Sequence, residues 1–291
     1  MKRYHNLHQI QQLDPIQDHQ EICRLMAGYE FPWDINRALE IALFRTFCVP
    51  SISALLDKTG EFHTRPQKRY DDTALIVAEI LKWGYDSDRG REAIRRMNHI
   101  HGRFQISNAD FLYVLSTFIY EPVRWLDRFG WRPMSRNERL ASFYFWQAVG
   151  QRMQIREIPD TYEAFERYNV EYEHQHFRYA KTNRLVGDST QNLLLSWFPS
   201  WLRPLVKPSV HSLLDERMLE AYGFTAPPVF LQQAIAYSLR LRGRILRWFP
   251  PRQQPKFYTD AHHRSYPHGY QLTQLGPPHL LESLNHCTKT K

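Results

Sequence analysis

Apolar residues recur every three or four positions over most of this 291-residue chain, which is the spacing of one face of an α-helix. Stretches that alternate between apolar and polar residues, as half-buried strands do, are almost absent. Hydrophobic residues make up 43% of the chain and charged residues 23%, so the chain can bury a large core. The sequence therefore predicts an all-α fold in which amphipathic helices enclose one interior.

Helix-capping residues mark where several of these helices begin. The expected starts are Asp34, Asp72 or Thr73, one of 86–88, Ser107, Ser135, and Asp160 or Thr161. The strongest of these signals is Ser135 followed by Glu138, because a serine with a glutamate three residues later forms a capping box. Gly84 and Gly102 are expected to end the second and third helices, and Pro122 the fourth.

The helix expected over 138–153 is apolar on almost every side, which is typical of a helix with neighbours all around it. We therefore predict a single multi-helix domain, 34–249, built around this central buried helix. The segment before it, 1–33, is polar and mixed, and the segment after it, 250–291, is rich in Pro, His and Gln. We expect this C-terminal tail to be extended and to lie on the surface.

The chain has 38 basic and 30 acidic residues, a net charge of +8, which permits binding to nucleic acid or anionic lipid and requires neither. No helix-turn-helix, RRM or zinc pattern supports nucleic-acid binding, so we expect none. The three cysteines show no CxxC spacing, and the chain begins without an apolar signal region. No apolar run reaches the roughly 20 residues of a bilayer span. These features predict a cytoplasmic protein, or one that lies on a membrane surface without crossing it.

Two aromatic and basic stretches, 197–208 and 238–252, favour a membrane surface as a partner. In the second stretch, three arginines fall on one side of a helix and three apolar residues on another. Tryptophans beside arginines suit the boundary between lipid headgroups and acyl chains. The alternative is a core helix with a basic outer face, and the residues alone leave both interpretations open.

Two histidines lie on apolar helix faces. His101 follows Ile94 and Met97 at helical spacing, and His176 falls in a stripe of aromatic residues within 165–179. An inward imidazole is either a hydrogen-bonded core residue or a metal ligand. The residues alone leave both alternatives open for each histidine.

Arginines crowd around the first of these histidines. Arg95 and Arg96 precede His101 in the same expected helix, and Arg103 follows it. Guanidinium groups can grip carboxylates, such as those of a haem or of an acidic substrate, whereas the alternative is a solvated basic face. The chain contains no HExxH, GxSxG, Walker loop or zinc spacing that would indicate a different chemistry.

Four segments in order, 69–118, 121–132, 145–159 and 168–177, resemble the MpaB-like oxygenase family, which includes the latex-clearing rubber oxygenases. The first contains RYDDT and IRRMNHIHGRF, and the last is YNVEYEHQHF. The resemblance implies an all-α oxygenase. The rubber oxygenases cleave carbon–carbon double bonds of polyisoprene with O₂, using haem b held by an axial histidine.

The resemblance also assigns residues. The family's arginines ahead of a histidine at a helix end match Arg95, Arg96 and His101. Its upstream arginine and threonine match Arg69 and Thr73. We therefore expect His101 to ligate a haem iron, with Arg69 and Thr73 in the cofactor site. Arg95 and Arg96 are the expected catalytic arginines, which hold carboxylates or tune the site.

Many bacterial members carry a further histidine in a Trp-Val-His segment, whereas 110–118 of this chain contains none. If that histidine is the axial ligand in those proteins, His101 or His176 serves here, or haem is absent. Fungal members are anchored to the endoplasmic reticulum by an N-terminal span, and this sequence shows none. We therefore expect a peripheral or soluble enzyme that acts with O₂ on a hydrophobic, isoprenoid-like or lipid-like molecule. The alternative is a non-catalytic, membrane-associated protein that keeps the fold and has lost haem.

Overall fold

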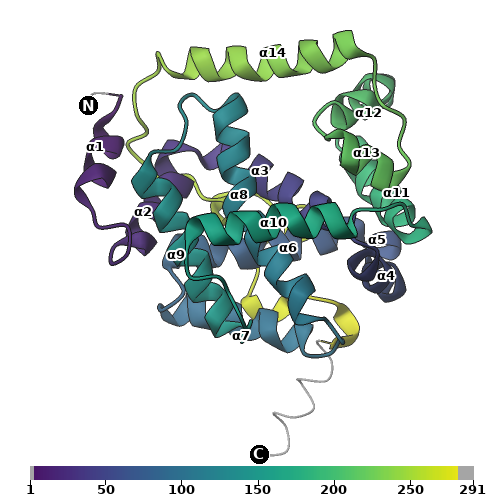
Figure 1. Cartoon of the computed structure of the whole chain (residues 1–291), viewed down its shortest axis with the longest axis horizontal. Coiled ribbons are helices and arrows are strands. Elements are labelled where there is room, and N and C mark those ends of the chain that lie inside the picture. The colour runs from purple at the N-terminus through teal and green to yellow at the C-terminus, as the bar shows by residue number, and fades with distance from the viewer. Residues whose placement is uncertain (1–2, 281–291) are drawn as a thin grey trace, which may run out of the picture.

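A computed structural model describes residues 3–280, which form an assembly of helices of different lengths (Figure 1). The α-helices are α1 (His5–Gln12), α2 (His19–Leu25), α3 (Pro32–Thr46), α4 (Pro50–Thr59), α5 (Glu61–Thr64), α6 (Pro66–Trp83), α7 (Asp88–His101), α8 (Asn108–Phe129), α9 (Arg136–Arg152), α10 (Tyr162–His176), α11 (Lys181–Ser196), α12 (Arg203–His211), α13 (Glu216–Tyr222) and α14 (Val229–Leu246). Short π or 3₁₀ turns are η1 (Met26–Glu30), η2 (Ser200–Leu202), η3 (Tyr258–Asp260) and η4 (Leu272–Gln274). The described residues form no strand beyond one isolated bridge, so the predicted all-α class is confirmed.

Several helices begin where the capping residues predicted. The hydroxyl groups of Ser107, Ser135 and Thr161 each accept a hydrogen bond from the backbone N–H three residues later. The capping box of α9 is complete, because Glu138 also accepts a bond of 2.7 Å from the backbone nitrogen of Ser135. These contacts satisfy donors that a helix start leaves without intrahelical partners.

Three expected helix boundaries are wrong, and each involves proline. Helix α6 begins at Pro66 rather than near Asp72, and α3 begins at Pro32, which places Asp34 inside the first turn. Proline suits the first turn because its missing N–H has no intrahelical partner there in any case. Helix α8 runs through Pro122 to Phe129 instead of stopping before the proline. Its extensive burial offsets a penalty of roughly 3 kcal/mol for an interior proline.

The central helix is α8 rather than α9. Helix α8 contacts α3, α9, α10 and α14, whereas α9 packs mainly between α2 and α8. Tyr113, Ile119 and Tyr120 of α8 are fully buried. Helix α9 carries the apolar residues that the sequence indicated, but α8 is the helix with neighbours along its whole length.

Both ends of the described chain contribute to the same core as the middle. Ile10 of α1 and Ile22 of α2 are fully buried, so the N-terminal segment is more than a polar extension. In the C-terminal tail, Phe257, Leu272 and Leu275 are buried in that core. The expectation that the tail only lies on the surface is therefore wrong for its described part, and 281–291 lie outside the described residues.

Within residues 3–280, no single helix is long and apolar enough to cross a bilayer. Helices α3 and α4 together reach that length and composition, but they are bent by 97° relative to each other. Cys23 and Cys48 are buried free thiols, and Cys287 lies outside the described residues.

Candidate functional site

The candidate site is centred on His101, in the last turn of α7. The N-terminal end of α8 supplies the ring of Phe111, whose centroid lies 5.4 Å from that of the imidazole. The Nδ1 atom of His101 is buried and has no hydrogen-bond partner. A buried polar atom without a partner costs free energy, so this nitrogen is either strained or placed to bind something.

The imidazole of His101 is held in its neutral form. Burial, assisted by the positive charge of Arg69, lowers the pKa of His101 from 6.5 to about 4. Both causes act in the same direction, because each disfavours the imidazolium ion. A neutral imidazole keeps the lone pair that a metal ion requires.

Arg96 lies on the same helix, with its side chain directed inward. Its Nε atom donates to the backbone carbonyl of Leu275 at 2.6 Å, while Nη2 is buried and has no partner. Burial lowers the pKa of Arg96. A buried guanidinium with an unused donor can bind a carboxylate. Gly276 passes close to this group, since a Cβ atom there would lie 3.4 Å from Nη2.

Arg69 and Thr73 are one turn apart on α6, and the guanidinium of Arg69 donates to the Thr73 hydroxyl. The Arg69 guanidinium also lies 5.3 Å from the ring centroid of Phe62. Burial lowers the pKa of Arg69, and nearby Asp72 and Glu61 oppose that effect. Since the charge of Arg69 also acts on His101, the structure brings the α6 and α7 candidates into one neighbourhood.

Arg95 and His176 are placed differently. Arg95 is exposed, in contrast to the buried Arg96 beside it. His176 ends α10, where its ring stacks on Tyr172 with centroids 4.1 Å apart. The Tyr172 hydroxyl donates to Asp110 at 2.7 Å. His176 therefore contacts Tyr172, which is hydrogen-bonded to Asp110, the residue before Phe111. The His176 ring has no buried nitrogen atom without a partner.

Three buried carboxylates of α6, missed as site features, attach the tail to this region. Asp71 accepts from the backbone nitrogen of Ser265, and Asp72 from that of Gly276, each at 3.0 Å. Glu79 accepts from the hydroxyl of a tail tyrosine and from Arg89. The sequence indicated Asp72 as a possible helix start, but α6 begins at Pro66, so all three acids lie within the helix. No local sequence signal could have paired them with a segment about 200 residues later.

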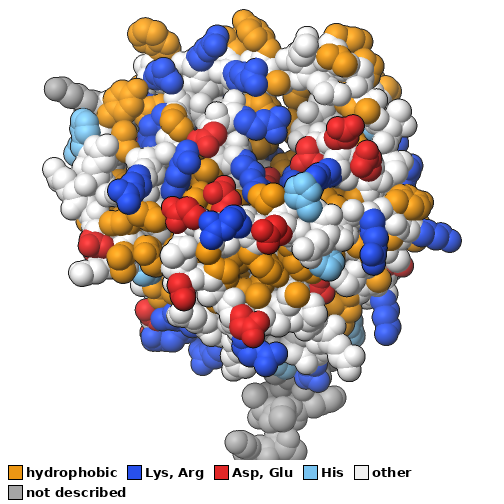
Figure 2. All heavy atoms as spheres, in the orientation of Figure 1, with side chains coloured by type: hydrophobic (Ala, Val, Ile, Leu, Met, Phe, Trp, Pro, Cys, Tyr) orange, Lys and Arg blue, Asp and Glu red, His pale blue; other side chains and the backbone are white. Residues whose placement is uncertain are grey.

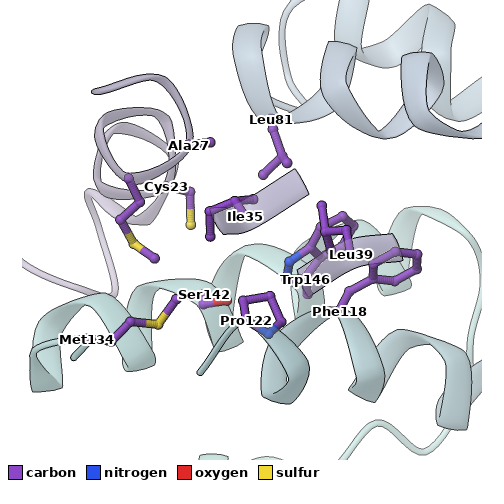
Figure 3. Close-up of a pocket in the computed structure, with 11 residues that line it drawn as sticks. Cys23, Ala27, Ile35, Leu39, Leu81, Phe118, Pro122, Met134, Ser142 and Trp146 are labelled. Carbon is purple, nitrogen blue, oxygen red and sulfur yellow. The ribbon is translucent and has the colours of Figure 1, made fainter. Parts of the chain in front are cut away.

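A small apolar cavity lies apart from His101, among helices α2, α3, α6, α8 and α9 and the η1 turn. Figure 3 shows Ile35, Leu39, Phe118 and Trp146 among the side chains that converge on it. Its volume is about 20 Å³, which is room for about one water molecule. None of the six residues singled out in the sequence lines it.

A second polar cluster surrounds Arg45 of α3. Its guanidinium forms a two-bond contact with Glu173, at 2.6 Å for each bond, and a further bond with Asp215. Tyr113 also donates to Glu173, at 3.1 Å. Each of these polar groups has a hydrogen-bond partner, so the cluster joins α3, α8, α10 and α13 and these residues leave no unsatisfied buried atom.

No group of three or more His, Cys, Asp or Glu side chains in residues 3–280 is arranged to hold a metal ion on its own. The fold and the site thus define an all-helical protein in which a partly buried, neutral imidazole lies near Arg69. Residues 38–248 match the family described as "ER-bound oxygenase mpaB/B'/Rubber oxygenase, catalytic domain". The chain belongs to this oxygenase family.

Three fungal relatives show the same likeness. The ER-bound oxygenase mpaB' of Penicillium brevicompactum is 31% identical over 249 residues, 79% of this chain and 59% of that protein. The ER-bound oxygenase mpaB of Penicillium roqueforti (strain FM164) is 31% identical over 220 residues, 69% of this chain and 74% of that protein. The ER-bound oxygenase mpaB of P. brevicompactum is 38% identical over 141 residues, 46% of this chain and 36% of that protein. The chain therefore spans about three fifths of the first relative.

Proposed function

We propose that this protein is a haem-dependent oxygenase that acts with O₂ on a hydrophobic, isoprenoid-like molecule, with oxidative cleavage of a carbon–carbon double bond as the reaction. The observation that carries the proposal is the neutral imidazole of His101, whose buried Nδ1 atom has no partner. The family description, which names oxygenases and a rubber oxygenase catalytic domain, supports the reaction class.

The donors around His101 suit a haem. A porphyrin supplies four nitrogen ligands itself, so the protein would need to add only one or two more. The His101 imidazole would meet that need, and its unpartnered nitrogen would then gain a partner. Phe111 packs against the ring and so limits its rotation. His176 is the weaker candidate, because it stacks on Tyr172 near the end of its helix.

Two arginines suit the carboxylates of such a group. Arg96 keeps a buried, unused Nη2 donor. At Arg69, burial outweighs the effect of the nearby carboxylates and lowers the pKa, so the positive charge is incompletely balanced. Each would gain from an anionic partner. Arg95 is exposed and would act only at the rim. When bound, the haem would supply the chemistry that activates O₂, while the chain's own residues hold, orient and desolvate it.

A hydrophobic substrate fits both the family description and this chain's composition. Rubber is a polyisoprene, and the family description includes a rubber oxygenase. Aromatic residues make up 14% of the chain, and large aromatic side chains provide apolar contact area with defined geometry. We therefore propose an unsaturated hydrocarbon chain as the substrate class.

The visible spectrum of the purified, haem-reconstituted protein tests the proposal. We expect a Soret band with the wild-type chain and its loss or displacement in His101→Ala. Added imidazole should restore the band in that variant by replacing the missing ligand. His174→Ala is the control, because His174 is exposed on α10 and its ring already accepts a hydrogen bond from Arg217, so it should leave the band unchanged.

Far-UV circular dichroism must show that each variant is folded. A wild-type chain that does not bind haem would overturn the proposal, as would a His101→Ala variant with an unchanged band. A colourless protein that binds lipid vesicles and consumes no O₂ would instead favour the non-catalytic alternative.

A further inference from the structure

Helix α14 is fixed on the protein by one of its faces. Leu239 and Leu246 pack against the core, and Arg242 forms an ion pair of 2.9 Å with the buried Asp34. Gly243 lies so close to α8 that a Cβ atom there would be 2.8 Å from the carbonyl oxygens of Phe129 and Gly130. The opposite face of α14 is therefore held outward.

That outward face is apolar, the reverse of what is usual for a surface helix. Its residues are Phe230, Ala234, Tyr237, Leu241 and Ile245. At 100° per residue they fall within a sector of about 80°, and Trp248 continues the line just beyond the helix. Phe230 is 72% exposed and Trp248 is 89% exposed. Such an array of exposed apolar residues marks an interaction surface.

The apolar surface continues onto the neighbouring helix. Helix α12 contacts α14. Leu205 of α12, Trp201 of the preceding turn η2, and Phe198 just before that turn are all exposed. Trp201 is 74% exposed. Together these residues and the outward residues of α14 with Trp248 form what we call the α12–α14 face. It lies along the upper part of the molecule in Figures 1 and 2, where hydrophobic and basic side chains lie side by side.

Within the two stretches that build this face, the acidic residues are missing and the charged side chains are basic. The sequence contains no Asp or Glu in 189–214 or in 221–259, which are the two stretches that build it. Arg203 and Lys207 lie on α12, and Arg240 and Arg244 lie beside the apolar line of α14; all four are exposed. A partner that complements this face must therefore have an anionic surface and an apolar interior beneath that surface. Lipid with anionic headgroups has both properties.

We propose that the α12–α14 face docks onto the surface of an anionic lipid bilayer, with α14 lying parallel to the membrane plane. Trp201 and Trp248 would sit at the headgroup boundary, and the arginines would contact lipid phosphates. The proposal does not depend on haem, because none of these residues belongs to the His101 site. It would hold the protein at the membrane, where a hydrophobic molecule dissolves.

Sedimentation of the full-length protein with vesicles tests the proposal. We expect binding to vesicles of phosphatidylcholine and phosphatidylglycerol, weaker binding to phosphatidylcholine alone, and weakening by salt. Arg240→Gln with Arg244→Gln should lower the affinity about 25-fold, at roughly fivefold per arginine. The control pair Arg156→Gln with Arg167→Gln removes the same charge from exposed positions elsewhere and should bind as the wild type does, apart from a small effect of net charge.

The apolar part is tested by Trp201→Ser with Trp248→Ser, which should lower vesicle affinity by about tenfold or more. The control is Trp83→Ser, since Trp83 is 50% exposed but lies at the end of α6, outside this face. Wild-type protein that ignores anionic vesicles, or variants that bind as well as their controls, would overturn the proposal. So would a dimer in vesicle-free solution that Trp248→Ser abolishes, because the face would then be an interface between copies. Vesicle binding that persists in His101→Ala separates this proposal from the haem proposal.

Discussion

A buried cluster of three charges at the start of α9 allows a sharp test of how the fold is held together. The guanidinium of Arg132 lies between Glu30 and Glu138, with shortest N–O distances of 2.7 Å to each. Both carboxylate side chains are fully buried, and that of Arg132 is 6% exposed. Asn6 donates to Glu30 at 3.1 Å, so the cluster also connects the N-terminal helix to this region.

Replacing Arg132 with alanine leaves two carboxylates buried without their cation. Removing one partner of a buried pair costs about 3–5 kcal/mol, and here one cation serves two anions, so we expect a loss at or above the upper end. That is a large share of a typical folding free energy of about 5–15 kcal/mol. Glu30→Gln with Glu138→Gln in the same background should recover much of the loss, because the stranded charges are gone.

Urea unfolding at pH 7, followed by circular dichroism, measures these differences. The matched control is Arg139→Ala, which breaks an exposed ion pair of 2.9 Å with Asp127 and should cost less than about 1 kcal/mol. If Arg132→Ala costs no more than the control, the cluster does not stabilise the fold as argued. A triple variant as unstable as Arg132→Ala would show that packing, rather than stranded charge, causes the loss.

Three further predictions concern separate parts of the fold. Both ring nitrogens of His211 are hydrogen-bonded and burial lowers its pKa from 6.5, so the unfolded chain binds its proton more readily. The stability due to neutral His211 is therefore complete above pH 6.5 and is lost as the pH falls below it. The urea unfolding midpoint should change more between pH 7.5 and pH 5 for the wild type than for His211→Gln. Equal changes in the two proteins would contradict this. Gly243→Ala should destabilise by about 1–3 kcal/mol, because the added carbon meets the backbone carbonyls of Phe129 and Gly130; a higher thermal midpoint, as helix propensity alone would give, would refute the close approach. Leu275→Ala should cost about 2–5 kcal/mol in urea unfolding, since Leu275 is fully buried, whereas a loss below about 0.5 kcal/mol would place the tail on the surface after all.

The periodicity of the sequence was sufficient to predict the helices and to place His101 on the inward face of its helix. Ser107, Ser135 and Thr161 cap their helices as predicted, because a cap is a contact between residues three apart in the chain. The side of α7 that carries His101 followed from the same local geometry, since Ile94 and Met97 lie on it. The predicted boundaries failed at prolines. At Pro66, a proline in the first turn begins the helix ahead of the expected acidic cap. At Pro122, the burial of α8 offsets the cost of an interior proline.

The tertiary structure alone decided what surrounds these residues. The sequence treated Arg95 and Arg96 alike, but only the fold exposes one and buries the other against the carbonyl of Leu275, 179 residues away. The sequence left 238–252 open between a core helix and a lipid-facing one, and the packing of Gly243 against α8 settled which face of α14 points outward. Local patterns fix helices because their hydrogen bonds join near neighbours. Burial, and with it charge and pKa, depends on segments that meet only when the whole chain has folded.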